Sequence, residues 1–134
     1  VGAALDEYRA RARSAGGRPY VVVSLDVLVA DSESAARELA LPEAWALAAA
    51  RTTGQFPALE PVDPDRALSP RQRTIVEDAV GRTIHGDESV VAAELGELLD
   101  RTGADELLAS TSTFDIGALR ESDARLARLL DRAF

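Results

Sequence analysis

Residues 87–115 read DESVVAAELGELLDRTGADELLASTSTFD, and this stretch decides the fold of the chain. Asp87 is a good helix cap, the leucines and valines after it recur at helical spacing, and Gly103 ends the helix. The apolar run 104–110 follows, and Asp115 caps a last amphipathic helix. The order helix, buried strand, helix is typical of α/β proteins, so we expect an α/β fold.

A second apolar run lies upstream, at Tyr20–Ala30. Its valines and leucines are nearly continuous, as in strands of a parallel sheet that helices cover on both faces. We therefore predict that the strands 20–30 and 104–110 are parallel and adjacent. Two such strands make a poor sheet by themselves, and a chain that begins and ends on a helix suggests the end of a repeated β-α architecture. The fold class predicted is α/β, the C-terminal portion of a (βα)₈ barrel, because a whole barrel takes about 250 residues.

Helices are predicted around these strands. One spans Leu5–Ser14, and another begins at Asp31 or Ser32. Pro42 is expected in the first turn of a continuation to Arg51. Inward-facing positions are predicted for these side chains: Ala36, Leu39, Ala40, Leu95, Leu98, Ile116, Leu119, Leu126 and Leu130.

The middle of the chain is less regular. Residues 52–67 carry Gly54 and three prolines, so we expect a long loop. Ser69-Pro70 is a strong helix start, and Gly81–Gly86 is expected to be a connector. We interpret residues 1–134 as a single incomplete domain, the last βα units of a barrel with a helical insertion at about 42–86.

Polar residues occur where the strands end. Ligands of α/β proteins bind at the carboxyl ends of strands, where Ser110, Thr111, Ser112 and Thr113 follow the second strand. An alternative reading of this run is a simple turn in which Thr113 or Asp115 caps the next helix. Asp26 interrupts the first apolar run, and a buried unpaired charge costs several kcal/mol, so we expect it to be paired, protonated or at the barrel mouth.

The composition of the chain argues against several classes of function. The formal charge of −8 argues against nucleic-acid binding, since no basic patch offsets it. No run approaches the ~18 apolar residues of a membrane helix, and no signal peptide is evident, so we expect a cytoplasmic protein without membrane contact. Cysteine is absent, which excludes disulfides and thiolate chemistry, and no metal site is expected. Methionine is absent even at position 1, so we expect something to precede Val1 or to have been removed.

Several stretches resemble the C-terminal part of bacterial luciferase-like, flavin-dependent monooxygenases. They are RPYVVV at 18–23, VADSESA at 29–35, HGDE at 85–88 and RTGADELL at 101–108. The resemblance extends over essentially the whole chain and implies that 20–30 and 104–110 are the seventh and eighth barrel strands. The stretch after the last strand departs from the family pattern in lacking a His, and HGDE lacks the Pro of the family's connector.

The resemblance implies a cofactor, reduced FMN or a deazaflavin, and a small-molecule substrate in the parent enzyme. It implies that Ser110, Thr111, Ser112, Thr113 and Asp26 contribute to cofactor binding. The earlier strands supply most flavin contacts in such enzymes, so we expect this chain alone to bind no cofactor and to be inactive. Its expected partner is a second copy or the missing N-terminal part of the barrel, because open sheet edges pair with other chains.

Two further residues, His85 and Trp45, are candidates for a functional role. His85 is the only histidine, and its place in a connector favours a structural or solvated role over that of a general base. Trp45 lies at helical spacing with leucines, which favours core or interface over flavin stacking. The alternative function is a non-catalytic, truncated paralogue that acts as an assembly or binding module.

Overall fold

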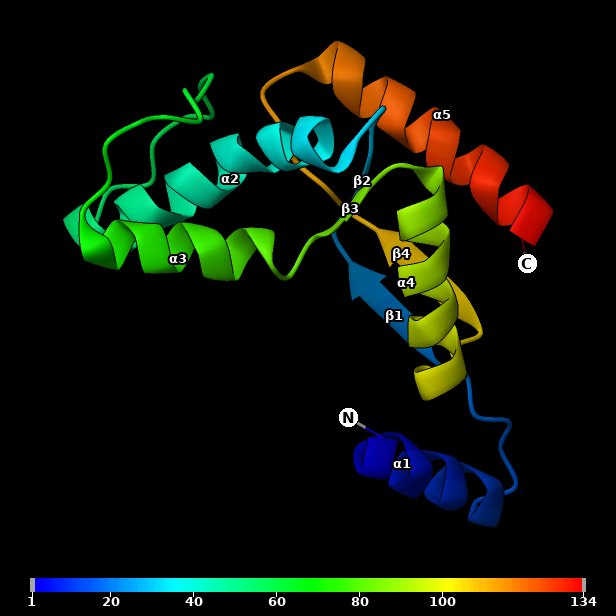
Figure 1. The fold of residues 1–134 in the computed structure, drawn as a ribbon. Coiled ribbons are helices and arrows are strands. Elements are labelled where there is room, and N and C mark those ends of the chain that lie inside the picture. Colours follow the sequence, from blue (N-terminus) through cyan, green and yellow to red (C-terminus); the bar gives the residue numbers. More distant parts are fainter. Residues whose placement is uncertain (1, 134) are drawn as a thin grey trace.

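The computed structural model describes residues 2–133 and has an α/β architecture (Figure 1). Its elements, in chain order, are α1 (Gly2–Ser14), β1 (Val22–Leu25), β2 (Val27–Val29), α2 (Glu33–Thr53), α3 (Pro70–Val80), β3 (Ile84–Gly86), α4 (Glu88–Thr102), β4 (Glu106–Ala109) and α5 (Ile116–Ala133). The strands form two parallel pairs, β1 with β4 and β2 with β3. No helix within residues 2–133 is long and apolar enough to cross a membrane.

The β2–β3 pair is covered on both faces. Its register aligns Val27 with Ile84 and Val29 with Gly86. Leu28 packs into one apolar cluster with α2 and α3, whereas Val27 and Val29 pack into a second cluster with α4 and α5. Successive residues of a strand point to opposite faces, so these three residues bind the two helical layers to one strand.

The β1–β4 pair is covered on one face only. Its register aligns Val22 with Glu106 and Ser24 with Leu108. Leu25 and Leu107 pack toward the cluster of α4 and α5. On the opposite face Val22 is 48% exposed and Leu108 53% exposed. The β1–β4 pair thus has one face without a covering layer, and this face carries Ser24 and Glu106 as well as the exposed Val22 and Leu108.

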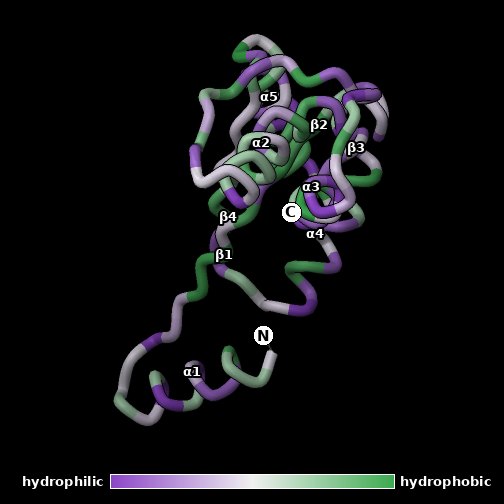
Figure 2. Tube along the Cα trace, turned by 90° about the vertical axis from the view of Figure 1, so that its left-hand side faces the viewer, coloured by the Kyte–Doolittle hydropathy of each residue, from purple (hydrophilic) through white to green (hydrophobic). Residues whose placement is uncertain are grey.

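Helix α1 lies apart from the other elements, beyond the amino end of β1 (Figures 1 and 2). None of its described residues is buried. The guanidinium of Arg9 donates hydrogen bonds to the carbonyls of Thr102 and Gly103, which end α4. A cation at the carboxyl end of a helix is favourable, so Arg9 both satisfies these carbonyls and attaches α1.

The strand predictions are confirmed in part. The predicted parallel pairing of the two apolar runs is the β1–β4 pair. The run 20–30, however, is two short strands separated at Asp26, and the predicted connector 81–86 contains β3. This strand was missed because Ile84-His85-Gly86 is short and is not an apolar run. It forms because α2 and α4 cover it from both sides.

The helix predictions need two corrections. Pro42 does not begin a new helix but lies inside the continuous helix α2, where it is buried. It lacks an amide hydrogen for the Glu38 carbonyl, and its burial among apolar neighbours offsets that loss. Ile116 is 56% exposed, so it does not face inward as predicted. Leu95 is 1% exposed, as predicted, and Leu98 is half-buried.

Candidate functional site

Two strands deliver polar residues to the same place because they are parallel. Asp26 follows β1 directly, and Ser110 follows β4 directly. The Ser110 amide donates a hydrogen bond to the Leu25 carbonyl at 3.1 Å, which holds the two strand ends side by side. Asp26 and the hydroxyl run 110–113 therefore meet at the carboxyl end of this pair, the end at which ligands bind in α/β proteins.

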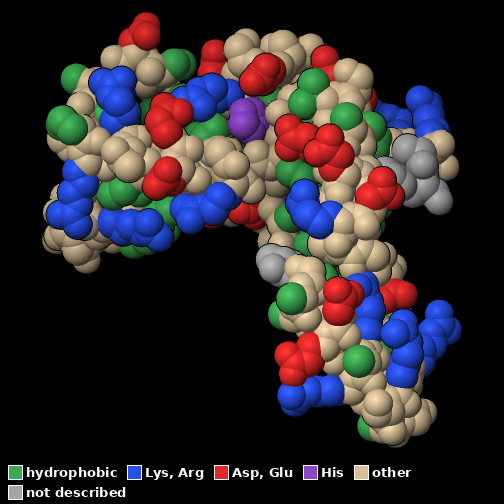
Figure 3. Space-filling view, turned by 60° about the horizontal axis from the view of Figure 1, so that its bottom comes forward, with side chains coloured by type: hydrophobic (Ala, Val, Ile, Leu, Met, Phe, Trp, Pro, Cys, Tyr) green, Lys and Arg blue, Asp and Glu red, His purple; other side chains and the backbone are tan. Residues whose placement is uncertain are grey.

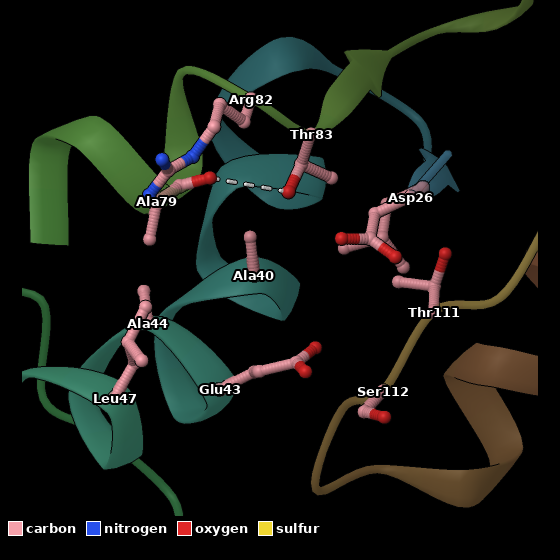
Figure 4. A pocket seen from close by; sticks show the side chains of 11 residues that line it. Asp26, Ala40, Glu43, Ala44, Leu47, Ala79, Arg82, Thr83, Thr111 and Ser112 are labelled. Atoms are coloured by element: carbon pink, nitrogen blue, oxygen red, sulfur yellow. Dashed lines mark hydrogen bonds between the residues drawn. The ribbon is translucent and has the colours of Figure 1, made fainter. Parts of the chain in front are cut away.

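A cavity of about 180 Å³ opens at these strand ends (Figure 4). Its polar lining consists of Asp26, Glu43, Arg82, Thr83, Thr111 and Ser112. Its apolar wall comes from Leu28, from Ala40, Ala44 and Leu47 on α2, and from Ala79 on α3. The cavity thus lies where the open β1–β4 pair meets the two helices that cover β2.

The hydroxyl run divides into two kinds of residue. The Thr111 hydroxyl accepts a hydrogen bond from the Val27 amide and donates one to the Val27 carbonyl, both at 2.8 Å. Thr113 is 4% exposed. Ser110 and Ser112 are exposed, and Ser112 lines the cavity. Within this run, the serine side chains are accessible to a ligand, whereas Thr111 is bound to the Val27 backbone and Thr113 is buried.

Asp115, not Thr113, caps the last helix. Its carboxylate accepts a hydrogen bond from the Ala118 amide at 2.9 Å. Asp115 is one of the two caps predicted for this turn. The turn reading therefore holds for residues 113–115, while Thr111 and Ser112 line the cavity.

Glu43 was not identified as a site residue from the sequence. It projects from α2 toward Ser112, across the cavity from Asp26 (Figure 4). Burial raises the pKa of its carboxyl above the ordinary 4.5, the charge of Asp26 raises it further, and a hydrogen bond from the Ser112 backbone acts in the opposite direction. The sequence signal was a single carboxylate in the otherwise apolar stretch 39–50.

The polar groups of this cavity favour some ligand groups over others. Two carboxylates and one arginine line it, so the lining as a whole disfavours a phosphate group. Carboxylate and serine oxygens accept hydrogen bonds from hydroxyl or ring N–H donors. The lining thus suits a neutral ligand group that carries hydrogen-bond donors. No group of His, Asp and Glu suited to a metal ion occurs in residues 2–133.

His85 and Trp45 lie outside this cavity's lining. His85 is part of β3, so its predicted place in a connector is wrong. Its Nδ1 lies 2.8 Å from the Thr83 carbonyl oxygen. Trp45 packs against the cluster of α2 and α3, and the Arg66 guanidinium lies 3.8 Å from its ring centre. Trp45 is partly buried against this cluster, which agrees with the predicted core or interface position.

Comparison with known proteins links this chain to flavin enzymes. No protein-family profile matches it. Two curated proteins named luciferase-like monooxygenase, from Escherichia coli strains K12 and O6:H1, are each 30% identical over 101 residues. The match covers 73% of this chain and 30% of each relative. The resemblance to luciferase-like monooxygenases is thereby confirmed, and the chain spans less than a third of the relatives' length.

Solved structures support the fold. Apo-MsnO8 superposes with a TM-score of 0.68 at 19% identity, and the match covers 97% of this chain and 41% of that one. A type II Baeyer-Villiger monooxygenase has a TM-score of 0.64 at 20% identity. It is the oxygenating constituent of 3,6-diketocamphane monooxygenase from the CAM plasmid of Pseudomonas putida, in complex with FMN, and is covered to 39%. The predicted fold class, a portion of a luciferase-like α/β barrel, is confirmed.

Proposed function

We propose that this chain, a relative of the luciferase-like monooxygenases, is the C-terminal part of a flavin-dependent monooxygenase. Residues 1–134 are then an incomplete domain that holds the last βα units of a barrel, and the helical segment at about 42–86 is an insertion between them. The single observation that carries the proposal is that Asp26 and Ser112, from the carboxyl ends of two parallel strands, line one cavity. The remaining strands belong to a part of the protein that this chain does not span.

In this proposal the chain supplies one wall of the flavin site. Reduced FMN, or a deazaflavin, brings the capacity to activate oxygen or transfer hydride. The chain's own residues orient it: Ser112 and Asp26 accept hydrogen bonds from its neutral donors, and Ser110 extends the polar edge. Thr111 positions this edge by tying it to the Val27 backbone at 2.8 Å.

The charges that line the cavity agree with a site that contacts only part of the flavin. With two carboxylates and one arginine in its lining, the phosphate of FMN must be held elsewhere. We therefore expect the chain alone to bind no flavin and to be inactive. A small-molecule substrate and a cytoplasmic location are part of the same proposal, and the absence of cysteine agrees with a reducing compartment.

Flavin titration tests this proposal. FMN fluorescence quenching is measured with this chain and with a longer polypeptide in which its own upstream sequence precedes it. We expect binding only by the longer polypeptide. In that polypeptide Ser112→Ala should weaken binding about 2- to 10-fold, the effect of one hydrogen bond. The matched control is Ser14→Ala, which removes an exposed hydroxyl at the end of α1 and should change nothing.

One observation favours the alternative, a non-catalytic assembly module. The face of the β1–β4 pair that carries Val22 and Leu108 is open, and exposed apolar side chains of this kind favour binding of another protein. The titration separates the two functions. A longer polypeptide that folds but binds neither FMN nor a deazaflavin would contradict the enzyme proposal and leave the assembly module.

A further inference from the structure

A second pocket lies between α2, α3 and the segment that connects these helices. It has a volume of about 80 Å³, and residues 62–68 of the connecting segment close one side of it. None of its lining residues lines the cavity at the strand ends. Its charged lining consists of Arg37, Asp63, Arg66, Arg73 and Glu77. The pocket is thus separate from the candidate flavin site.

Arg66 holds the connecting segment against α2. Its guanidinium lies 3.8 Å from the centre of the Trp45 ring, and a cation over the face of an indole is favourable. The Asp65 amide donates to the Asp63 carboxylate at 2.9 Å, and the Arg66 amide donates to the Asp63 carbonyl at 3.0 Å. Stacking leaves the N–H donors at the guanidinium edge for other partners, and only one of its nitrogens lies near a carboxylate, Glu60 at 3.3 Å. Arg66 is thus presented to the pocket in a defined orientation.

Positive charge exceeds negative charge in this pocket. Three arginines and two carboxylates line it, whereas two carboxylates and one arginine line the cavity at the strand ends. Both carboxylates have hydrogen-bond partners: Asp63 belongs to the turn described above, and Glu77 accepts from Arg37 at 2.7 and 2.9 Å. Arg73 forms no ion pair with any residue that the structure describes. Figure 3 shows basic side chains, in blue, close together on the lobe of α2 and α3, although the chain as a whole has a charge of −8.

The size and the apolar part of the lining restrict the ligand. Drug-sized ligands occupy pockets of about 300–1,000 Å³, so a volume of about 80 Å³ takes only a small molecule. The side chains of Trp45, Val62 and Leu68 belong to the lining, so they favour a ligand with an apolar part. A carboxylate matches the fork of N–H donors on a guanidinium. A short-chain carboxylate meets both requirements, whereas inorganic phosphate has no apolar part.

We infer that this pocket binds a small organic acid. Its carboxylate accepts hydrogen bonds from the guanidinium groups of Arg66 and Arg73, and its apolar end lies against Val62 and Leu68. Binding here is independent of the proposed flavin site, because the two cavities share no lining residue.

A fluorescence titration tests the inference. Trp45 is the only tryptophan of the chain, so its emission reports on this pocket directly. The chain is titrated with sodium propionate at constant pH and ionic strength, and sodium phosphate and sodium chloride are the comparison salts. We expect a saturable change with propionate and a Kd on the order of 1 mM, as is reasonable for so small a ligand. Phosphate should bind more weakly, and chloride should give no change.

Arg73→Gln removes the unpaired positive charge. Loss of a hydrogen bond between charged groups should weaken propionate binding about 10- to 100-fold. The denaturant midpoint should not change, because Arg73 is exposed. The matched control is Arg71→Gln, which replaces an exposed arginine of the same helix that does not line the pocket and should keep the wild-type affinity.

NMR spectra recorded during the same titration detect binding that leaves the tryptophan emission unchanged. The backbone amides of Val62 and Val76, on opposite sides of the chain segment that forms the pocket, should shift with propionate in the wild type. The same shifts should need a higher propionate concentration in Arg73→Gln.

Three results would overturn the inference. A response that does not saturate by either method, or that chloride reproduces, would be an effect of salt only. Equal weakening by Arg71→Gln and Arg73→Gln would mean a diffuse attraction to the basic lobe in place of a site. Tighter binding of phosphate than of propionate would exclude the organic acid as the preferred ligand.

Discussion

The two parallel strand pairs of this chain have the same direction and similar lengths, yet their surroundings differ. Leu28 in β2 is 0% exposed, and Leu108 in β4 is 53% exposed. Helices α2 and α3 cover one face of the β2–β3 pair, and α4 and α5 cover the other. The β1–β4 pair has helices on one face only. The chain thus supplies helices on both faces of the β2–β3 pair and on only one face of the β1–β4 pair.

The candidate site lies between the covered β2–β3 pair and the open β1–β4 pair. Asp26 separates β1 from β2, so it lies where the covered region gives way to the open one. Glu43 reaches it from the covering helix α2, and Ser112 reaches it from the open pair. The covered half can hold these groups in position, while the open half leaves them accessible to a ligand and to the rest of a barrel.

The largest expected effect compares one leucine from each pair. Leu28→Ala should lower the free energy of unfolding by about 2–5 kcal/mol, because it leaves a cavity between α2, α3 and β2. Leu108→Ala should cost under about 1 kcal/mol in the isolated chain, since much of its side chain is in water. Urea denaturation of both variants measures this. Equal losses would show that the face carrying Leu108 is covered in solution.

A smaller effect compares two serines. The Ser122 hydroxyl is 1% exposed and accepts a hydrogen bond from the Val29 amide at 2.9 Å. Ser122→Ala leaves that buried amide without a partner and should cost about 1–3 kcal/mol. Ser110→Ala at the open end should stay within about 0.5 kcal/mol. Denaturant melts measure both, and a neutral Ser122→Ala would mean that water replaces the hydroxyl.

The fold could be predicted where a strand is apolar along its length. The apolar runs 20–30 and 104–110 predicted the parallel pairing correctly. The expectation that helices cover both faces holds for β2 and β3 but is wrong for β1 and β4, where Val22 and Leu108 are exposed. Strand β3 carried no such signal. Its Gly86 is selected by close packing, since a Cβ there would lie 2.9 Å from the Val90 side chain. Contacts of this kind depend on tertiary structure and leave little trace in a sequence pattern.

The site could be predicted only in outline. Strand ends located Asp26 and residues 110–113, but composition could not tell which hydroxyls face a ligand. The Thr111 hydroxyl turned out to be bound to the Val27 backbone. Glu43 lies far from either strand in sequence, and only the path of α2 across the strand ends brings it to Asp26. The role of these residues in binding a flavin stays a prediction.

The smallest expected effect concerns the protonation of Glu43, which lies between the covered β2–β3 pair and the open β1–β4 pair. Because burial and then Asp26 raise the pKa of Glu43 in the folded protein, the folded state binds its proton more tightly than the unfolded chain does. Stability contributed by the protonated carboxyl is therefore present below the ordinary pKa of 4.5 and is lost as the pH rises through the raised folded value. Solvent screens a half-buried carboxyl, so the effect should be modest.

Glu43→Gln removes this titration. The variant should match the wild type in stability below pH 4.5 and gain on it as the pH rises through the folded pKa of Glu43. Urea melts at a series of pH values measure the difference, and Glu38→Gln, an exposed carboxylate on the same helix, is the control. Asp26→Asn should lower the pKa of Glu43 by removing the second cause of its rise. Two results would contradict this arrangement: a stability difference between Glu43→Gln and the wild type that does not change with pH, or one that Asp26→Asn leaves unchanged. Either result would mean that the Glu43 and Asp26 carboxylates do not lie in the same cavity.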